Sequence, residues 1–431
     1  MKKIILIIIA QILFAQIAAA DIKTFTLSNK IKVIFEKTDK REIVSLKVFT
    51  PVSSISENKK NYGISYLTFK AMTNSTLKRN KEKLANDLDD IGASISGDAK
   101  LQYAYLGVNV LSQNFDKAAE ILSDVIINPA FRVSEIRAAK EEILLDLSLR
   151  KDNAALFALD NFMSVFYRGS APAYPNLGTV KTIKALKISD IKRWHKYSYN
   201  SQNIIISAAG NIDEEILKNS LEKHFSKIKS GQKFKQNAVK IAKSKKRFFY
   251  FKSKFNSAVI VIGYGAPGLN SKELPAFDLL TVILGDGLNG KLAKEIRVNS
   301  GLTYNINMFY SLMRQKNSAM ILSLTDSKNV KKTLKKIDEI LKEMSSKKAE
   351  SGDLERAKIK EKADFLFNAQ TVDEKSFNNG WGETVAGSFK YKTDFLNSIS
   401  EVSLEDILKS AEKTFKQKPV VIIMTPSKSR K

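Results

Sequence analysis

Apolar residues recur along the chain at two spacings, and segments with the two spacings are interspersed. Apolar positions three and four residues apart predict amphipathic helices, as in Phe115–Ile127 and Val133–Ser148. Short runs rich in β-branched and aromatic residues, such as Ile43–Pro51 and Leu101–Leu111, predict strands. Because the helices and strands follow one another without a strict β–α–β alternation, the pattern predicts an α+β fold.

The same order of predicted elements occurs twice, in residues 21–228 and in residues 247–431. The intervening residues 229–246 are polar, rich in lysine and poor in large apolar residues, which is typical of a linker. The period of about 200 residues is far too long for a solenoid repeat. We therefore expect two homologous halves, each a mainly antiparallel sheet packed with helices, arranged with pseudo-twofold symmetry around a cleft.

The segment Leu284–Asn307 combines a glycine-rich turn, a short helix and a strand. Three residues four apart give the predicted helix one apolar face: Leu288, Leu292 and Ile296. Gly301 is a suitable helix stop, and an alternating pattern typical of a half-buried strand runs from Tyr304 to Tyr310. Arg297 lies in the last helical turn and Tyr304 early in the strand, so both side chains are predicted to project toward one spot.

Two interpretations of Arg297 and Tyr304 remain open from spacing alone. In the first, the two side chains form a binding site. In the second, Arg297 is a cation favoured at a helix C-terminus, and Tyr304 faces the core from its strand. Tyr310 and Arg314 are further candidates for the binding role. Spacing favours the second interpretation.

The composition is that of an ordinary soluble protein, with 43% hydrophobic and 27% charged residues in 431. Lys and Arg total 71 against 45 Asp and Glu, a net charge of +26 that is spread through the chain. A basic balance bears on solubility and non-specific binding rather than on fold. No basic-helix or stacking-aromatic motif supports a nucleic-acid partner, whereas a basic interior would attract acidic or unfolded polypeptide.

The first 20 residues have the pattern of a cleaved secretory signal peptide, in which two lysines precede an apolar run and three alanines precede Asp21. Removing it takes two lysines and leaves 26 − 2 = +24. No later stretch reaches the roughly 20 apolar residues of a spanning helix. The sequence therefore predicts a periplasmic protein without a stable membrane span. The absence of cysteine excludes disulfides and thiolate zinc ligands.

Four stretches together resemble the pitrilysin/insulinase-like (M16) zinc peptidases, over nearly the whole predicted mature chain. They are Gly63–Met72 (GISYLTFKAM), Asn176–Ile212, Ile262–Gly268 and Leu284–Tyr304. The resemblance implies the same duplicated α+β architecture. It also implies that the first of these stretches is the helix on which peptide-cleaving members of the family carry the H-x-x-E-H metal motif.

The positions that match the metal motif hold Tyr66, Phe69 and Lys70, and the third ligand falls at or near Asp146. In the family, two histidines one turn apart bind zinc and the glutamate acts as general base. A lysine ammonium offers only donors and repels a dication. The other candidate ligands, His195 and His224, lie in basic helical stretches and are expected to be surface or half-buried residues. The sequence thus predicts no metal site in this chain.

The resemblance gives Arg297 and Tyr304 a second meaning. In heterodimeric members of the family, a zinc-free subunit contributes an Arg and a Tyr from its second half to the shared active chamber, and these two residues match those positions. The resemblance therefore implies a substrate-binding, non-catalytic subunit that pairs with a zinc-bearing subunit and binds peptide or unfolded polypeptide. The alternatives are a stand-alone periplasmic peptide-binding or envelope-assembly protein, and an active protease with altered ligands.

Overall fold

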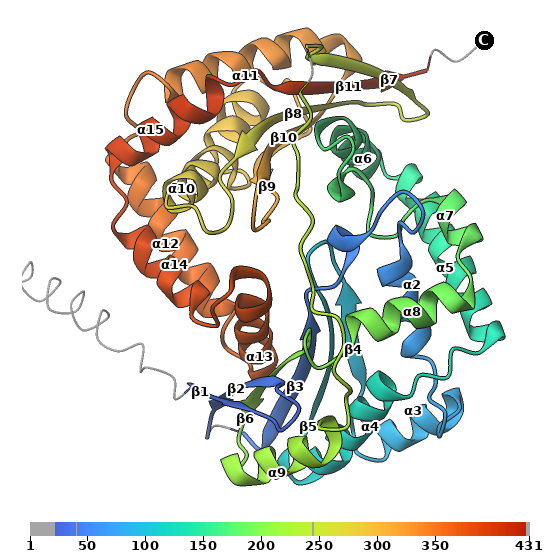
Figure 1. Cartoon of the computed structure of the whole chain (residues 1–431). Coiled ribbons are helices and arrows are strands. Elements are labelled where there is room, and N and C mark those ends of the chain that lie inside the picture. The colour runs from blue at the N-terminus through green and yellow to red at the C-terminus, as the bar shows by residue number, and fades with distance from the viewer. Residues whose placement is uncertain (1–21, 40, 244, 428–431) are drawn as a thin grey trace, which may run out of the picture.

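The computed structural model describes residues 22–39, 41–243 and 245–427 (Figure 1). The predicted signal peptide, residues 1–20, lies outside them. The first half is built on a six-stranded sheet in the order β1–β2–β6–β3–β5–β4. Its strands are β1 Ile22–Thr26, β2 Lys32–Lys37, β3 Ile43–Thr50, β4 Ile95–Ala99, β5 Ala104–Leu111 and β6 Ile205–Gly210. Its helices are α2 Ile64–Met72, α3 Lys81–Asp89, α4 Phe115–Ile127, α5 Val133–Asp152, α6 Ala154–Phe166, α7 Val180–Ala185, α8 Ile188–Ser198 and α9 Glu214–Phe225.

The second half is built on a five-stranded sheet in the order β7–β11–β8–β10–β9. Its strands are β7 Phe248–Ser253, β8 Ala258–Ala266, β9 Asn305–Tyr310, β10 Asn317–Thr325 and β11 Val420–Pro426. Its α-helices are α10 Leu274–Gly285, α11 Val330–Met344, α12 Ser351–Phe367, α13 Val372–Trp381, α14 Tyr391–Ser400 and α15 Leu404–Phe415. Two π-helical turns, η4 Ala293–Val298 and η6 Gly382–Ala386, complete it.

Each sheet contains one parallel pair, β2 with β6 and β7 with β11, and all its other pairs are antiparallel. The parallel pair occupies the same place in both halves, which confirms the predicted α+β fold of two homologous, mainly antiparallel halves. Helix α15 begins with a capping box: the Ser403 hydroxyl accepts the Asp406 N–H, and the Asp406 carboxylate accepts the Ser403 N–H.

Each half contributes one helix that covers the sheet of the other half. Helix α6 packs on β8 and β11 of the second half, and α13 packs on β3 and β6 of the first (Figure 1). A Cβ at Gly263 of β8 would lie 2.0 Å from the Phe162 ring of α6. A Cβ at Gly380 of α13 would lie 2.2 Å from the Phe49 ring of β3. Glycine is needed at both places because an aromatic ring from the other half occupies the space, so the halves interlock.

Charged side chains reinforce the contact between α13 and the first sheet. Lys47 of β3 is 1% exposed, and its Nζ lies 2.5 Å from Oδ1 of Asp373. On β2, the buried Glu36 carboxylate pairs with Lys375 and accepts a hydrogen bond of 2.8 Å from the Asn379 amide. Removing one partner of such a buried pair typically costs about 3–5 kcal/mol. These ion pairs therefore oppose separation of the two halves.

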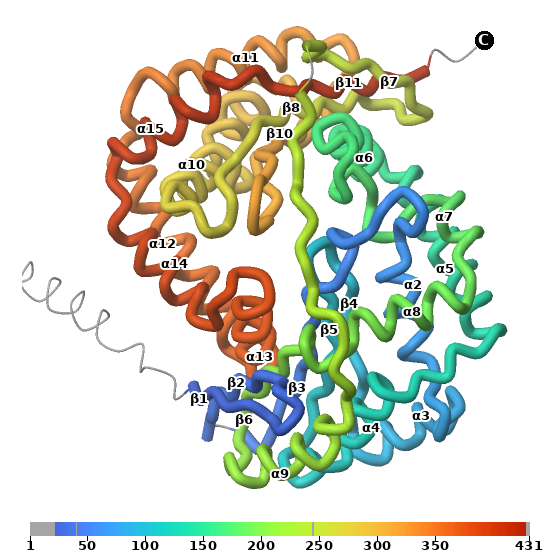
Figure 2. The backbone as a smooth tube through the Cα atoms, in the orientation of Figure 1, coloured from blue at the N-terminus to red at the C-terminus, as the bar shows by residue number. Residues whose placement is uncertain are grey.

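The described residues of 229–246 form neither helix nor strand, yet both halves bind them. From the first half, the Asn203 amide donates to the Gln232 carbonyl at 3.0 Å, and from the second half, Oε1 of Gln315 accepts the Val239 N–H at 2.8 Å. Figure 2 shows this segment running along the molecule from α9 to β7. Within the described residues, no helix combines the length and apolar character required to cross a bilayer.

Candidate functional site

A buried carboxylate and a glycine position the start of α2. Glu57 accepts hydrogen bonds from the N–H groups of Gly63 at 2.7 Å and Ser65 at 2.9 Å. These bonds satisfy two N–H groups at the helix start that have no partner within the helix. Gly63 has φ +90°, and a Cβ there would lie 2.6 Å from the Leu177 carbonyl oxygen, so no other residue fits. Burial raises the pKa of Glu57 to about 7.

Helix α2 lies against α5 and brings together the four positions predicted from the metal motif. The Tyr66 and Phe69 rings are 6.5 Å apart, and the Lys70 ammonium lies 5.9 Å from the centroid of the Tyr66 ring. Lys70 also forms an ion pair with Glu142 of α5. Asp146, one helical turn further along α5, acts electrostatically on both Tyr66 and Lys70. We call these five residues the α2–α5 site.

The α2–α5 site does not fit a zinc ion. Phe69 is 9% exposed and its ring lies 3.0 Å from where a Cβ of Gly97 would be, so it fills the core rather than acting as a base. The Lys70 ammonium occupies the space beside Tyr66 and is bound to Glu142. No group of three His, Asp or Glu side chains within metal-binding reach exists in the described chain. No step of any reaction is therefore assigned to a metal here.

Glu142 is the member of this site that the sequence analysis missed. It lies four residues before Asp146, so the two carboxylates share one face of α5. This four-residue spacing of Glu142 and Asp146 was the sequence signal that could have identified Glu142. The side chain that binds Lys70 is Glu142, whereas the Asp146 carboxylate forms no hydrogen bond or ion pair with any described residue.

Tyr66 also lines a cavity of about 350 Å³ between α2, the end of β4, α5 and α6. The Arg150 guanidinium on its wall forms a two-pronged ion pair with Asp160, with nitrogen–oxygen distances of 2.6 and 2.7 Å. The remaining charged wall residues, Asp98 and Lys100, pair at 2.5 Å. All four charges of this cavity are thus neutralised within the chain.

Arg297 and Tyr304 lie in a very different setting. Arg297 is on the turn η4, and Tyr304 directly precedes β9 and is 62% exposed. Neither side chain forms a hydrogen bond or ion pair with any residue of the described chain. Gly301 between them has φ +58°, which is the helix stop that the sequence predicts. Both side chains are accessible to another molecule.

Two details of the predicted helix and strand are wrong. Leu288 is 58% exposed, whereas Leu292 and Ile296 are buried as predicted. Leu288 follows Gly287, which has φ +51°, and precedes the helical turn, so it shares the four-residue spacing but not the helix. Tyr304 lies outside the strand, so its side chain does not follow the alternation that buries Ile306 and Met308. The core-facing interpretation of Tyr304 is therefore wrong.

The other candidates have partners or no evident role. The Tyr310 hydroxyl donates to Oδ1 of Asp278 at 2.7 Å, and Arg314 is exposed. His224 is 7% exposed and contacts Asp116 at 3.0 Å, so the prediction of a surface or half-buried position is wrong for this residue. His195 lies 2.9 Å from the Ile126 carbonyl oxygen, and burial lowers its pKa to about 4. Neither histidine belongs to the α2–α5 site.

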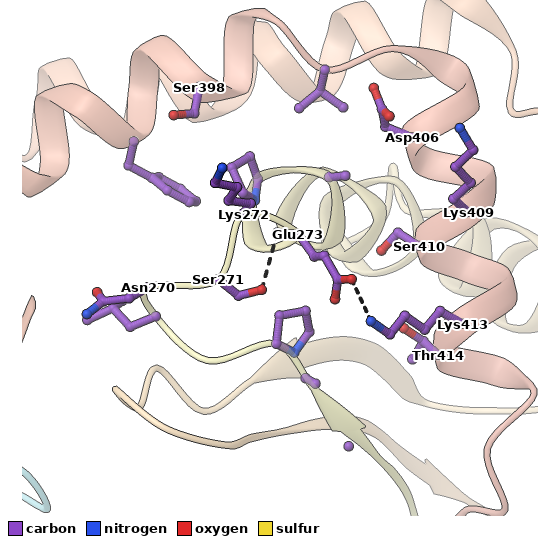
Figure 3. A pocket seen from close by; sticks show the side chains of 18 of the residues that line it. Asn270, Ser271, Lys272, Glu273, Ser398, Asp406, Lys409, Ser410, Lys413 and Thr414 are labelled. Atoms are coloured by element: carbon purple, nitrogen blue, oxygen red, sulfur yellow. Dashed lines mark hydrogen bonds and ion pairs between the residues drawn. The ribbon is translucent and has the colours of Figure 1, made fainter.

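A cavity of about 940 Å³ lies in the second half between α10, α14 and α15. Figure 3 shows Lys413 of α15 facing Glu273 at the start of α10, with 2.5 Å between Nζ and Oε1. A cavity of about 510 Å³ occupies the corresponding place in the first half, beside α2 and α8, where Trp194 and Tyr197 line it. These paired cavities show how closely the two halves correspond. None of the predicted site residues lines either one.

Two models of one peptidase family match the chain. The model "Insulinase (Peptidase family M16)" matches residues 32–180, and the model "Peptidase M16 inactive domain" matches residues 185–361. The chain belongs to the M16 peptidase family. Within this M16 chain, the first match contains the α2–α5 site, and the second contains Arg297 and Tyr304.

Known relatives cover the M16 chain almost completely. An uncharacterized zinc protease of Rickettsia felis is 25% identical over 405 residues, covering 94% of this chain and 97% of the relative. A Pseudomonas fluorescens structure described as a peptidase M16 inactive domain has a TM-score of 0.87 at 18% identity, with 95% and 100% of the two chains covered. The mitochondrial-processing peptidase subunit beta of Dictyostelium discoideum is 27% identical over 211 residues, covering 49% and 45%.

Proposed function

We propose that this protein is the zinc-free subunit of a periplasmic heterodimeric M16-type metallopeptidase, and that Arg297 and Tyr304 bind peptide in a chamber shared with a zinc-bearing partner. One observation carries the proposal. Arg297 and Tyr304 are exposed without partners in the described chain, whereas the side chains at the family's metal positions are packed or held by one another.

The chemistry of the two side chains supports a role in peptide binding. A guanidinium presents donors in a fixed plane, which suits peptide carbonyl oxygens. A phenol donates one hydrogen bond and stabilises charge that develops on a carbonyl oxygen. Strands β4 and β9 are the free edges of the two sheets on the side away from β1 and β7, so an extended peptide has a strand edge to pair with.

The relatives support the subunit part of the proposal. Residues 185–361 match a domain model named for its inactivity, and one relative is by name a subunit of a processing peptidase. The zinc-bearing partner, the peptide substrate and the periplasmic location come from the sequence resemblance and the predicted signal peptide. They are part of the proposal.

The test is to purify the native protein with any bound chain and to measure peptide cleavage by the assembly. We expect a second chain with an intact H-x-x-E-H motif and one zinc ion per assembly. Arg297→Ala and Tyr304→Phe should each lower kcat/KM about 100-fold, the usual effect of removing one such donor. Lys294→Ala is the matched control, because Lys294 is exposed on the same turn, and it should change cleavage less than about twofold.

Two results would overturn the proposal. A native protein that runs only as a monomer would favour a stand-alone peptide-binding protein. Full cleavage by assemblies carrying Arg297→Ala and Tyr304→Phe would remove both residues from substrate binding.

A further inference from the structure

Strand β7 forms an aromatic and exposed border of the second sheet (Figure 1). It pairs with β11 on one side, and no strand of the described residues pairs with its other side. Phe248 of this strand is 39% exposed and Tyr250 is 71% exposed. Arg297 and Tyr304 precede β9, which is the opposite edge of the same sheet. The proposed function therefore accounts for neither aromatic side chain of β7.

The corresponding edge of the first sheet is covered. Strands β2 and β7 occupy the same place, each in parallel with its neighbour, β6 or β11. Val33 and Phe35 of β2 therefore occupy the places of the two exposed aromatic residues of β7, yet they are only 0% and 1% exposed. They share an apolar cluster with residues of α9, and β1 pairs along the outer side of β2. Neither β1 nor α9 has a counterpart among the described residues of the second half.

The backbone of β7 has unpaired hydrogen-bonding groups along this edge. The Arg247 carbonyl accepts the Val421 N–H of β11 at 2.8 Å. In a parallel pair, the backbone groups of alternate residues face the neighbouring strand, so the odd-numbered residues of β7 bond to β11. The N–H and C=O groups of Phe248, Tyr250 and Lys252 therefore face outward, where no described strand pairs with them.

Cations lie at both ends of this edge. Arg247 directly precedes β7 and Lys252 lies within it, and both are exposed without an ion pair to any described residue. A lysine often protects a free edge against pairing. The Lys252 ammonium instead donates to Oγ1 of Thr425 at 3.3 Å, so it is directed over the sheet toward β11. We call Arg247, Phe248, Tyr250 and Lys252 the β7 edge, which is open and positively charged.

We propose that the β7 edge binds an extended, acidic segment of another polypeptide, which adds to the second sheet as a sixth strand. The first half shows the geometry, because β1 pairs antiparallel with β2 over five residue pairs. The added segment satisfies the outward N–H and C=O groups of β7. Its alternate apolar residues pack on Phe248 and Tyr250. Its carboxylates face Arg247 and Lys252.

A second copy of the chain and a lipid surface fit the β7 edge less well. Two β7 strands paired antiparallel about Tyr250 would place Lys252 of each copy beside Arg247 of the other, and like charges across a strand pair are destabilising. A bilayer accommodates aromatic and cationic side chains, but its hydrocarbon core offers no partner for the outward N–H and C=O groups. An acidic strand satisfies the backbone, the aromatic rings and the cations together.

The first test measures binding of an end-blocked, fluorescently labelled peptide, ETVTVE, to the full chain by fluorescence anisotropy. Paired antiparallel with β7, this peptide places valines opposite the two aromatic residues and glutamates opposite Arg247 and Lys252. We expect a Kd on the order of 100 µM at low salt, and weaker binding at high salt. The peptide KTVTVK, in which lysines replace the glutamates, should bind at least about tenfold more weakly.

Tyr250→Pro tests the backbone contribution. Proline is accepted on an edge strand where the N–H faces outward, and it removes the central donor for an added strand. Binding of ETVTVE should weaken at least about tenfold. Tyr250→Thr is the matched control, because it also loses the ring but keeps the N–H, and it should weaken binding less than about fivefold. Thermal unfolding reports whether each variant is folded.

The double variant Arg247→Gln/Lys252→Gln tests the charges without altering the backbone. Both side chains are exposed, so the variant should unfold at the temperature of the wild type. It should bind ETVTVE about tenfold more weakly than the wild type does, and the salt dependence should shrink. This variant keeps the proposal testable if Tyr250→Pro does not fold.

Hydrogen exchange with mass spectrometry distinguishes an added strand from a loose charge attraction. Saturating ETVTVE should slow exchange in the fragments that cover β7, by up to the three outward amides of Phe248, Tyr250 and Lys252. Fragments that cover β2 should be unchanged, because β1 already occupies the outer side of that strand.

Equal binding of ETVTVE by the wild type and a folded Tyr250→Pro variant would overturn strand addition, and equal binding of ETVTVE and KTVTVK would overturn the preference for an acidic segment. A wild-type dimer that Tyr250→Pro converts to a monomer in sedimentation velocity would instead assign the edge to a second copy. Binding to phosphatidylglycerol vesicles without binding of ETVTVE would assign it to lipid. These measurements leave Arg297 and Tyr304 unaltered, so their outcome is independent of the proposed function.

Discussion

The α2–α5 site and the Arg297–Tyr304 segment occupy opposite halves of the molecule and differ in how their polar side chains are used. In the α2–α5 site, Phe69 is packed in the core and Lys70 is bound to both Tyr66 and Glu142. On the other segment, Arg297 and Tyr304 bind no residue of the described chain. A side chain that is already satisfied within its own chain contributes to stability, whereas an exposed donor without a partner is available to a ligand.

The two halves therefore differ more in the chemistry of these side chains than in their fold. Five strands of the first sheet correspond in order to the five strands of the second, including the parallel pair, and β1 is an additional edge strand. Both halves also have a cavity at corresponding helices, beside α2 and beside α10. The chemistry differs because Tyr66, Phe69 and Lys70 are packed or paired within the chain, whereas Arg297 and Tyr304 are exposed. The following predictions test that distinction.

The largest expected effect is the restoration of metal binding at the α2–α5 site. In Tyr66→His/Lys70→His, two imidazoles lie one turn apart on α2 and face the carboxylates of Glu142 and Asp146, which no longer meet an ammonium. We expect one zinc ion per chain with Kd on the order of 1 µM, about 8 kcal/mol. Isothermal titration calorimetry measures it, with Tyr66→His alone as a control that should bind at least tenfold more weakly.

Because Phe69 remains in this variant, zinc should bind without peptide cleavage. Zinc binding by the unaltered chain at similar affinity would contradict the assignment of Lys70 as a group that excludes the metal.

The next largest effect is expected when one aromatic side chain is removed from the α2–α5 site, compared with the same change on the Arg297–Tyr304 segment. Phe69→Ala removes a ring that is 9% exposed and should lower the free energy of unfolding by about 3–5 kcal/mol. Tyr304→Ala removes a ring that is 62% exposed and should change it by less than about 0.5 kcal/mol. Urea denaturation followed by circular dichroism measures both. Equal losses would mean that Tyr304 is a packing residue.

Much of this distinction could be predicted from the sequence. The repeated order of elements predicts two α+β halves, and the chemistry of Tyr66, Phe69 and Lys70 predicts that the usual ligands are absent. A local signal was also reliable where it acts within a few residues, as for the Gly301 stop.

The remaining features depend on contacts between distant segments. The apolar patterns of α6 and α13 predict helices, but they do not reveal that each helix covers the other half's sheet. The pairing of Lys70 with Glu142 joins residues 72 positions apart, and spacing within α5 does not decide between Glu142 and Asp146. Leu288 shows a different error. Its spacing from Leu292 is that of a helix, but Leu288 lies in a glycine turn that is not helical.

A smaller effect is expected from the carboxylate that caps α2. Burial raises the pKa of Glu57 from 4.5 to about 7, so the folded chain retains a proton that the unfolded chain loses. Its stabilisation is therefore complete below about pH 4.5 and lost as the pH rises through 7, a total on the order of 3 kcal/mol. Urea denaturation at pH 5 and pH 8 should show a smaller fall for Glu57→Gln than for the wild type.

Asp213→Asn is the control, because Asp213 caps the exposed start of α9 in the same half. If Glu57→Gln retains the full pH dependence, then Glu57 is already ionised in the folded protein.

The smallest effect is expected from the Lys70–Glu142 ion pair of the α2–α5 site. Lys70 and Glu142 have side chains that are 27% and 52% exposed, and pairs of this kind contribute about 0–1 kcal/mol. Lys70→Ala should therefore lower the free energy of unfolding by no more than about 1 kcal/mol in urea denaturation, and high salt should shrink the difference. A loss above 2 kcal/mol would mean that the lysine is a structural replacement for the metal. A small loss means that Lys70 excludes a cation without supporting the fold, and the fold at this position then rests on Phe69.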